Sequence, residues 1–149
     1  MALRTRLFVC DNHPIVLDGF ASVFRSHDRV ELVGACSWDD DPAAYIDSSM
    51  ADVLVVDFAQ LCEEPSAFEV IRHDFPNVNV VVFVEENDLL NAMRALDLGA
   101  AGIVAKSSPL GALEEAVLRV ANGDNYLDVT MVPNIAFLAG NVPNEKRVH

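Results

Sequence analysis

The hydrophobic positions of the chain alternate between short continuous apolar runs and longer stretches in which apolar residues recur every three or four positions. Continuous runs rich in β-branched residues are typical of strands buried on both faces of a sheet, and the periodic stretches are typical of helices with one core-facing side. The runs that predict strands lie at 7–10, 30–36, 51–57, 78–84 and 102–106. The stretches that predict helices lie at 14–25, 42–46, 66–76, 88–99 and 113–123.

Polar residues and glycines mark the ends of the predicted helices. Asp41 and Asp88 precede apolar helical patterns and are expected to cap them. Ser66 and Glu69 have the spacing of a capping box, so a helix is expected to begin there. Gly99 is expected to end the preceding helix in a left-handed conformation. Strand and helix patterns thus alternate five times, which predicts an α/β protein with a parallel sheet, right-handed crossovers and helices on both faces.

Length, composition and charge limit the functions that the chain can have. Its 149 residues fit one domain, and a hydrophobic content of 52% excludes a mainly disordered chain. The formal net charge of −13 and the pI near 4.4 would repel DNA phosphates and anionic membranes. No apolar stretch approaches the ~20 residues of a membrane span, and the first residues lack a secretory signal pattern. We therefore expect a cytoplasmic protein with no membrane contact, whose partners are proteins, cations or small phosphorylated molecules.

The three cysteines, Cys10, Cys36 and Cys62, are odd in number and lack the spacing of metal ligands. Neither a disulfide framework nor a zinc site is therefore indicated, and buried thiols are the expectation. Cys10 adjoins the acidic residue that follows the first strand, which would raise the pKa of its thiol and make it less reactive. A redox-sensing role for Cys10 is the alternative.

Three charged residues end or follow predicted strands. Asp57 ends the central apolar run, Asp11 follows the first strand, and Lys106 ends the fifth. In a doubly wound sheet with the first strand beside the third, the carboxyl ends of these strands face one crevice, which would bring the three side chains together. Two carboxylates and an ammonium suit a hard divalent cation and a phosphoryl group. The alternative for Asp57 is a solvated loop residue or a helix cap.

Several segments resemble the receiver domain of two-component response regulators, in the branch whose receiver precedes a LuxR/FixJ-type helix-turn-helix DNA-binding domain. They are Asp11-Asn12-His13-Pro14, Asp57 at the position of the phosphoacceptor, and the run 99–106 that ends in Lys106. The resemblance covers about 7–126 and implies a flavodoxin-like (βα)5 fold, doubly wound, with strand order 2-1-3-4-5. It divides the chain into a receiver domain at 1–126 and a tail or linker at 127–149, with the output domain absent from this chain.

The resemblance also implies a chemistry for these residues. Asp57 would accept a phosphoryl group from a phosphohistidine on a sensor histidine kinase or from a small acyl phosphate, with Lys106 beside it. Mg²⁺ would be held by Asp11, the Asp57 carboxylate and the backbone carbonyl of Ala59. The family forms homodimers through its fourth helix, fifth strand and fifth helix, or through its first and fifth helices, and we predict a homodimer here. DNA would be contacted only through an output domain that this chain does not contain.

The chain departs from the family pattern at several positions around the predicted site. Asn12 stands where the family has a second acid, so it would be a weaker Mg²⁺ ligand. Val84 replaces a hydroxyl residue at the end of the fourth strand, and Glu85 adds negative charge beside it. Ile103 replaces an aromatic residue on the fifth strand.

These departures favour an atypical receiver that controls a transcriptional output and in which phosphorylation at Asp57 is impaired or absent. Such a domain would act by docking or dimerisation and would not be a turnover enzyme. Two alternatives stay open. One is a receiver that a histidine kinase phosphorylates fully, and the other is a small phosphotransferase or phosphatase that uses Asp57 as its nucleophile.

Overall fold

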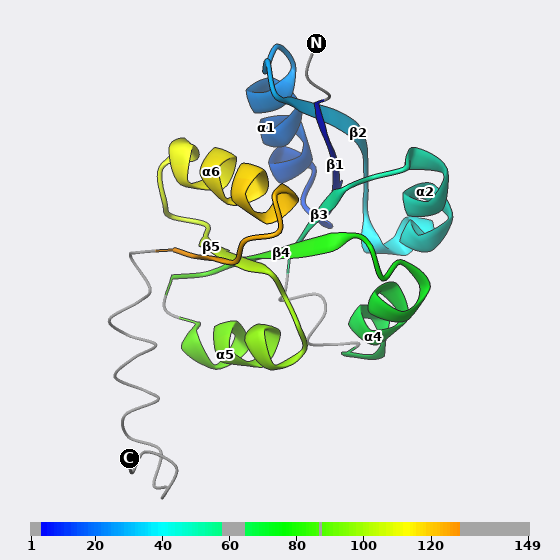
Figure 1. The fold of residues 1–149 in the computed structure, drawn as a ribbon, viewed down its shortest axis with the longest axis vertical. Helices are drawn as coiled ribbons and strands as arrows, with labels where there is room; N and C mark the ends of the chain where they lie inside the picture. The colour runs from blue at the N-terminus through cyan, green and yellow to red at the C-terminus, as the bar shows by residue number, and fades with distance from the viewer. Residues whose placement is uncertain (1–3, 58–64, 87, 129–149) are drawn as a thin grey trace, which may run out of the picture.

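The computed structural model describes residues 4–57, 65–86 and 88–128, and it shows a parallel sheet with helices on both faces (Figure 1). The strands are β1 (Thr5–Cys10), β2 (Val30–Cys36), β3 (Val53–Asp57), β4 (Asn79–Val84), β5 (Gly102–Ala105) and β6 (Tyr126–Leu127). The helices are α1 (Pro14–Phe24), α2 (Pro42–Ser49), α4 (Pro65–Asp74), α5 (Leu89–Asp97) and α6 (Leu110–Ala121), together with the 3-10 helix η1 (Trp38–Asp40). The strand order is β2-β1-β3-β4-β5-β6, so the predicted fold class and the predicted order of the first five strands are confirmed.

The helices form two layers because alternate side chains of the strands point to opposite faces of the sheet. On one face α1 and α6 pack against apolar residues that include Val9, Val55 and Val104. On the other face α2, α4 and α5 cover a second apolar cluster that includes Leu54 and Ile103. Figure 1 shows α1 and α6 on one side of the sheet and the other three helices on the opposite side. Central strands are therefore buried on both faces, which explains their continuous apolar sequences.

The ends of several elements differ from the sequence-based expectation. β6, which pairs in parallel with β5 at the edge of the sheet, was not among the predicted strands. The predicted side-chain cap at Asp41 is wrong: its backbone is left-handed with φ 58°, and its side chain makes no cap hydrogen bond to α2. The backbone of an N-cap residue is typically extended, as that of Ser37 is at the start of η1, where its side chain accepts the Asp39 N–H. The cap at Asp88 and the left-handed Gly99 are confirmed.

The capping box predicted at Ser66 and Glu69 stays a prediction. The helix begins at Pro65, one residue before the predicted start. The side chain of Ser66 lies outside the described residues. Proline fits the first position of a helix because an N–H at that position would have no acceptor within the helix, so its absence costs no hydrogen bond.

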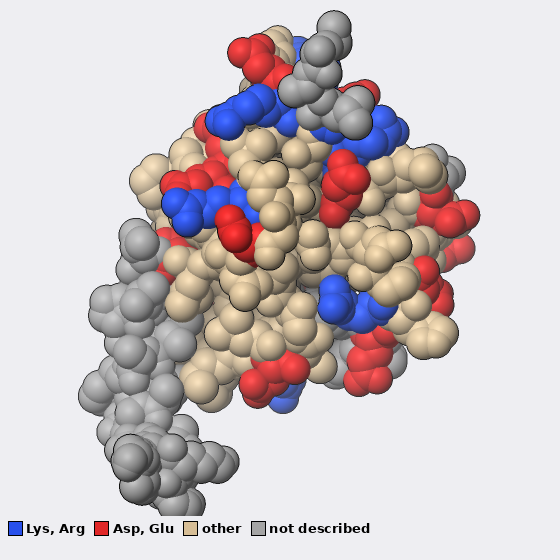
Figure 2. Space-filling model, in the orientation of Figure 1, with Lys and Arg blue, Asp and Glu red and all other residues tan. Residues whose placement is uncertain are grey.

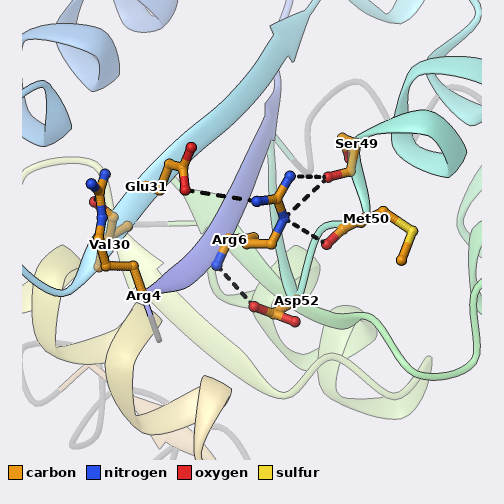
Figure 3. A network of polar contacts seen from close by, with 7 residues as sticks. All are labelled: Arg4, Arg6, Val30, Glu31, Ser49, Met50 and Asp52. Atoms are coloured by element: carbon orange, nitrogen blue, oxygen red, sulfur yellow. Dashed lines mark hydrogen bonds and ion pairs between the residues drawn. The ribbon is translucent and has the colours of Figure 1, made fainter. Parts of the chain in front are cut away.

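Arg6 fastens the amino-terminal edge of the sheet to the end of α2 (Figure 3). Its guanidinium donates to the carbonyls of Ser49, at 2.8 Å, and Met50, at 3.2 Å. Those carbonyls belong to the carboxyl end of a helix, where the helix dipole favours a cation. The same side chain lies 3.7 Å from Glu31 on β2, and the Arg6 backbone N–H donates to Asp52 just before β3. One residue thus connects β1, β2, α2 and the entry to β3.

Charged side chains are distributed over the surface of the described part. On the face in Figure 2, basic side chains stand among acidic ones, and an uncharged area lies between them. Within the described ranges, no helix combines the length and the apolar character that crossing a membrane requires.

Candidate functional site

Asp11, Asp57 and Lys106 lie together at the carboxyl edge of the sheet. Asp57 is the last residue of β3, Asp11 follows β1, and Lys106 follows β5. Both carboxylates are buried, each with 1% of its surface exposed. The Lys106 ammonium lies 3.2 Å from Asp57 Oδ1. The structure therefore brings together the three side chains that the sequence analysis singled out.

The backbone holds Lys106 in place beside the acids. Its N–H donates to the carbonyl of Val84 at 2.8 Å, which ties the start of the β5–α6 turn to the end of β4. Its ammonium lies 5.7 Å from the centre of the Phe83 ring, a distance that suits a cation–π contact. Phe83 pairs with Asp57 across β3 and β4 and packs edge-on against Phe20 of α1. Lys106 is therefore fixed by its backbone, an aromatic ring and a buried carboxylate.

His13 also belongs to this group, which the sequence analysis did not foresee. It is the N-cap residue of α1, and its backbone N–H donates to Asp11 Oδ1 at 2.8 Å. Its ring Nδ1 lies 2.8 Å from the same oxygen and 3.7 Å from Asp57 Oδ2. The signal was its position two residues after Asp11, because an aspartate side chain readily folds back onto the turn that follows it.

The donor set fits a hard divalent cation. Potential ligand atoms of Asp11, His13 and Asp57 all lie within 4.8 Å of one another. Two buried carboxylates beside one ammonium leave an excess of negative charge, and carboxylate oxygens are the ligands that Mg²⁺ prefers. Asn12 points elsewhere, since its Oδ1 accepts the Trp38 backbone N–H at 2.7 Å. Ala59, the fourth residue expected around Mg²⁺, lies outside the described residues.

Three of the positions that depart from the family pattern lie on β4, on β5 or directly after β4. Val84, at the end of β4, is buried in the apolar cluster on the α4 and α5 face. Glu85 follows it and is exposed. Ile103 is fully buried in the same cluster as Val84. No hydroxyl group therefore stands at the end of β4 next to Asp57, and an acid occupies the following position.

Comparisons with known proteins give the family context. No protein-family model matches the chain. The methanol utilization control regulatory protein MoxX of Paracoccus denitrificans is 29% identical over 136 residues, which cover 89% of this chain and 60% of MoxX. The isolated REC domain of RcsB from Salmonella enterica serovar Typhimurium superposes with a TM-score of 0.77 at 22% identity, over 87% of this chain and 97% of that domain. The chain is a homologue of response regulators, and its fold is that of their receiver domains.

Two further structures share the receiver fold. A LuxR-family two-component response regulator from Aurantimonas superposes with a TM-score of 0.80 at 20% identity, over 93% of this chain and 99% of the other. A structure of RcsB dimers bound to DNA gives a TM-score of 0.78 at 21% identity, over 89% of this chain and 68% of RcsB. The resemblance drawn from the sequence is therefore confirmed. This receiver fold spans about three fifths of the length of MoxX.

The receiver fold also contains a buried acid near Lys106 that the sequence analysis missed. Asp128 directly follows β6, and 1% of its surface is exposed. Its Oδ2 accepts the Ala105 backbone N–H at 3.0 Å and the Ser108 hydroxyl at 2.5 Å. Burial and the negative charge of Asp128 raise the pKa of the nearby Tyr126 hydroxyl. Asp128 thus holds the turn that carries Lys106.

Two cysteines end the two strands next to Asp11. Cys10 immediately precedes Asp11, and Cys36 ends β2 beside it. A hydrogen bond between the two thiols, followed by burial, raises the pKa of Cys10, and the same hydrogen bond lowers the pKa of Cys36. The rise expected for Cys10 is therefore present, although its main cause is Cys36 and not the neighbouring acid.

Proposed function

We propose that this chain is the receiver part of a transcription-regulating response regulator and that phosphorylation of Asp57 in it is impaired. The ion pair between Asp57 and Lys106, at 3.2 Å beside the buried Asp11, is the observation that carries the receiver assignment. A carboxylate nucleophile, an acidic neighbour and a cation beside them are the parts that phosphoryl transfer to aspartate needs, since that reaction depends mainly on positioning and charge neutralisation.

The surroundings of Asp57 support the impairment. Val84 cannot donate a hydrogen bond to phosphoryl oxygens, and Glu85 adds a negative charge where an anion would arrive. Asn12 contributes no charge, and its side-chain oxygen already accepts a backbone N–H. Each difference removes stabilisation from a transition state that carries negative charge.

Asp11 and Asp57 are the residues of this chain that would hold Mg²⁺, with His13 next to them. When bound, Mg²⁺ would neutralise part of the charge on the phosphoryl oxygens. Asn12 would bind it only by sharing the oxygen that accepts the Trp38 N–H. This proposed set of ligands is therefore expected to bind Mg²⁺ more weakly than a set with three acids.

The expected result with acetyl phosphate and Mg²⁺ is little or no phosphoryl adduct on this chain. The measurement is the intact mass of the protein after incubation, beside an Asp57→Ala variant and a conventional receiver as a positive control. Labelling of the control without labelling of this chain would support the impairment. An adduct as abundant as that of the control, and absent from Asp57→Ala, would contradict it. Multiple turnover of a phosphomonoester would instead support the phosphatase hypothesis.

A second arm of this experiment uses Val84→Thr. The hydroxyl would restore a donor at the end of β4, and we expect the rate of adduct formation to rise about tenfold. Val84→Ala is the matched control, because it shortens the side chain without adding a donor. A rise in both variants would assign the effect to space and not to the hydroxyl.

The proposed partners follow from the same assignment. RcsB forms dimers that bind DNA, and we propose that this chain forms a homodimer, pairs with a sensor histidine kinase and reaches DNA only through an output domain. The domain division at 1–126 and 127–149 is part of this proposal. Light scattering at high protein concentration is expected to give the mass of a dimer, and a monomer mass would contradict the dimer.

A further inference from the structure

Cys10 and Cys36 are brought opposite each other by an irregularity in the first strand pair. Thr5 pairs with Val30 and Leu7 with Leu32, but the register then shifts by one residue and Phe8 pairs with Gly34. Without this shift Cys10 would face Ala35. With it, Cys10 and Cys36 are direct partners at the carboxyl ends of β1 and β2.

The two thiols share one face of the sheet and belong to directly paired residues. Both belong to the apolar cluster on the α2, α4 and α5 face, and each thiol shifts the pKa of the other. Neighbouring strands lie about 4.8 Å apart, and a disulfide requires Cα atoms roughly 4.4 to 6.8 Å apart. Direct partners on adjacent strands therefore meet the Cα spacing that a disulfide needs.

We propose that Cys10 and Cys36 form a reversible intramolecular disulfide when the protein meets a peroxide. One thiol is first oxidised by hydrogen peroxide to a sulfenic acid, with release of water. The second thiol then attacks that sulfur, the S–S bond forms, and a second water leaves. Two S–H bonds and one O–O bond are broken overall, and the two electrons pass from the sulfurs to the peroxide.

The position of Cys36 gives the oxidant a route to the pair. β2 is the edge strand of the sheet, Cys36 is its last residue, and 7% of its surface is exposed, whereas Cys10 is fully buried. Cys36 is therefore the thiol that a small oxidant reaches first. Cys10 then lies beside it as the resolving thiol.

The bond would join the two strand ends that support the acidic site. Asp11 follows Cys10, and its N–H donates to the carbonyl of Cys36 at 3.1 Å. Two residues after Cys36, the Trp38 backbone N–H donates to Asn12. Oxidation at this place would add a covalent link next to Asp11, in parallel with these two hydrogen bonds. The proposal does not depend on phosphorylation of Asp57.

The test uses a Cys62→Ser background, which leaves only this pair of thiols. The protein is treated with hydrogen peroxide, denatured, alkylated and weighed intact. We expect both thiols to become unreactive, a mass lower by two hydrogen atoms, and full recovery of both thiols after dithiothreitol. Two alkylated thiols after treatment, added oxygen atoms on a monomer, or only intermolecular disulfides would each overturn the proposal.

Two controls separate the disulfide from other effects. Cys36→Ser and Cys36→Ala, in the same background, should keep Cys10 alkylatable after peroxide, and the pair of variants guards against poor folding of either one. Trp38 is the only tryptophan of the chain and packs against the cluster that contains both cysteines. Its fluorescence should therefore change on oxidation of the pair and return with dithiothreitol.

Discussion

Replacing Lys106 by methionine is expected to lower the free energy of unfolding by about 3 kcal/mol near neutral pH, because removal of one partner leaves a buried charge without compensation. The carboxylates of Asp57 and Asp11 are both buried, and the Lys106 ammonium lies 3.2 Å from Asp57. Methionine keeps most of the apolar stem near Phe83. The measured loss of stability therefore reports the removal of the ammonium charge and not a loss of packing. Urea denaturation at constant ionic strength is the measurement.

The matched control for this prediction is the pair of variants Asp57→Asn and Lys106→Met/Asp57→Asn. Asparagine removes the carboxylate that needs the ammonium, so the double variant should be more stable than Lys106→Met alone. The difference between the two backgrounds is the coupling energy of the pair. Equal losses from Lys106→Met in both backgrounds would show that the ammonium does not stabilise Asp57.

Replacing Asp128 by alanine is expected to cost about 2 to 3 kcal/mol of stability, since a buried N–H and a hydroxyl would lose a charged acceptor. Asp128 accepts from the Ala105 backbone N–H and from the Ser108 hydroxyl in a nearly solvent-free position. Thermal or urea unfolding measures the loss.

Asp128→Asn and Ser108→Ala divide that effect between its parts. Asparagine keeps an oxygen that can accept the Ala105 N–H. Asp128→Asn should therefore lose less than half of the stability that Asp128→Ala loses. Ser108→Ala removes only one donor and should cost about 1 kcal/mol. A loss from Ser108→Ala as large as that from Asp128→Ala would mean that the backbone contact contributes little.

The main elements could be predicted because their sequences carry strong periodic signals. The Val-rich run of β3 lies in the middle of the sheet with every residue buried, so a continuous apolar run and its structural cause coincide. β6 has only two residues, Tyr126 and Leu127, which is too short for any periodicity to be read. It forms because β5 leaves an edge to pair with, a tertiary cause that the local sequence does not record.

Part of the candidate site could be predicted from the sequence for a related reason. Asp11, Asp57 and Lys106 end or follow strong strands, so the topology alone places them on one edge. His13 and Asn12 differ, because the direction of each side chain depends on the turn after β1 and on the approach of Trp38 from another segment. The pairing of Cys10 with Cys36 depends on a single register shift, which pattern reading does not detect.

The contact at Asp128 has a practical consequence for shortening the chain. The proposed boundary at residue 126 cuts through β6 and removes Leu127, which pairs with Ile103, together with the acceptor for Ala105 and Ser108. A recombinant domain truncated there would have a frayed edge strand and a loosened turn at Lys106. A phosphorylation assay on it would then report the effect of the truncation and not the properties of the intact receiver. A fragment that continues past Asp128 keeps β6 and the residue that anchors it.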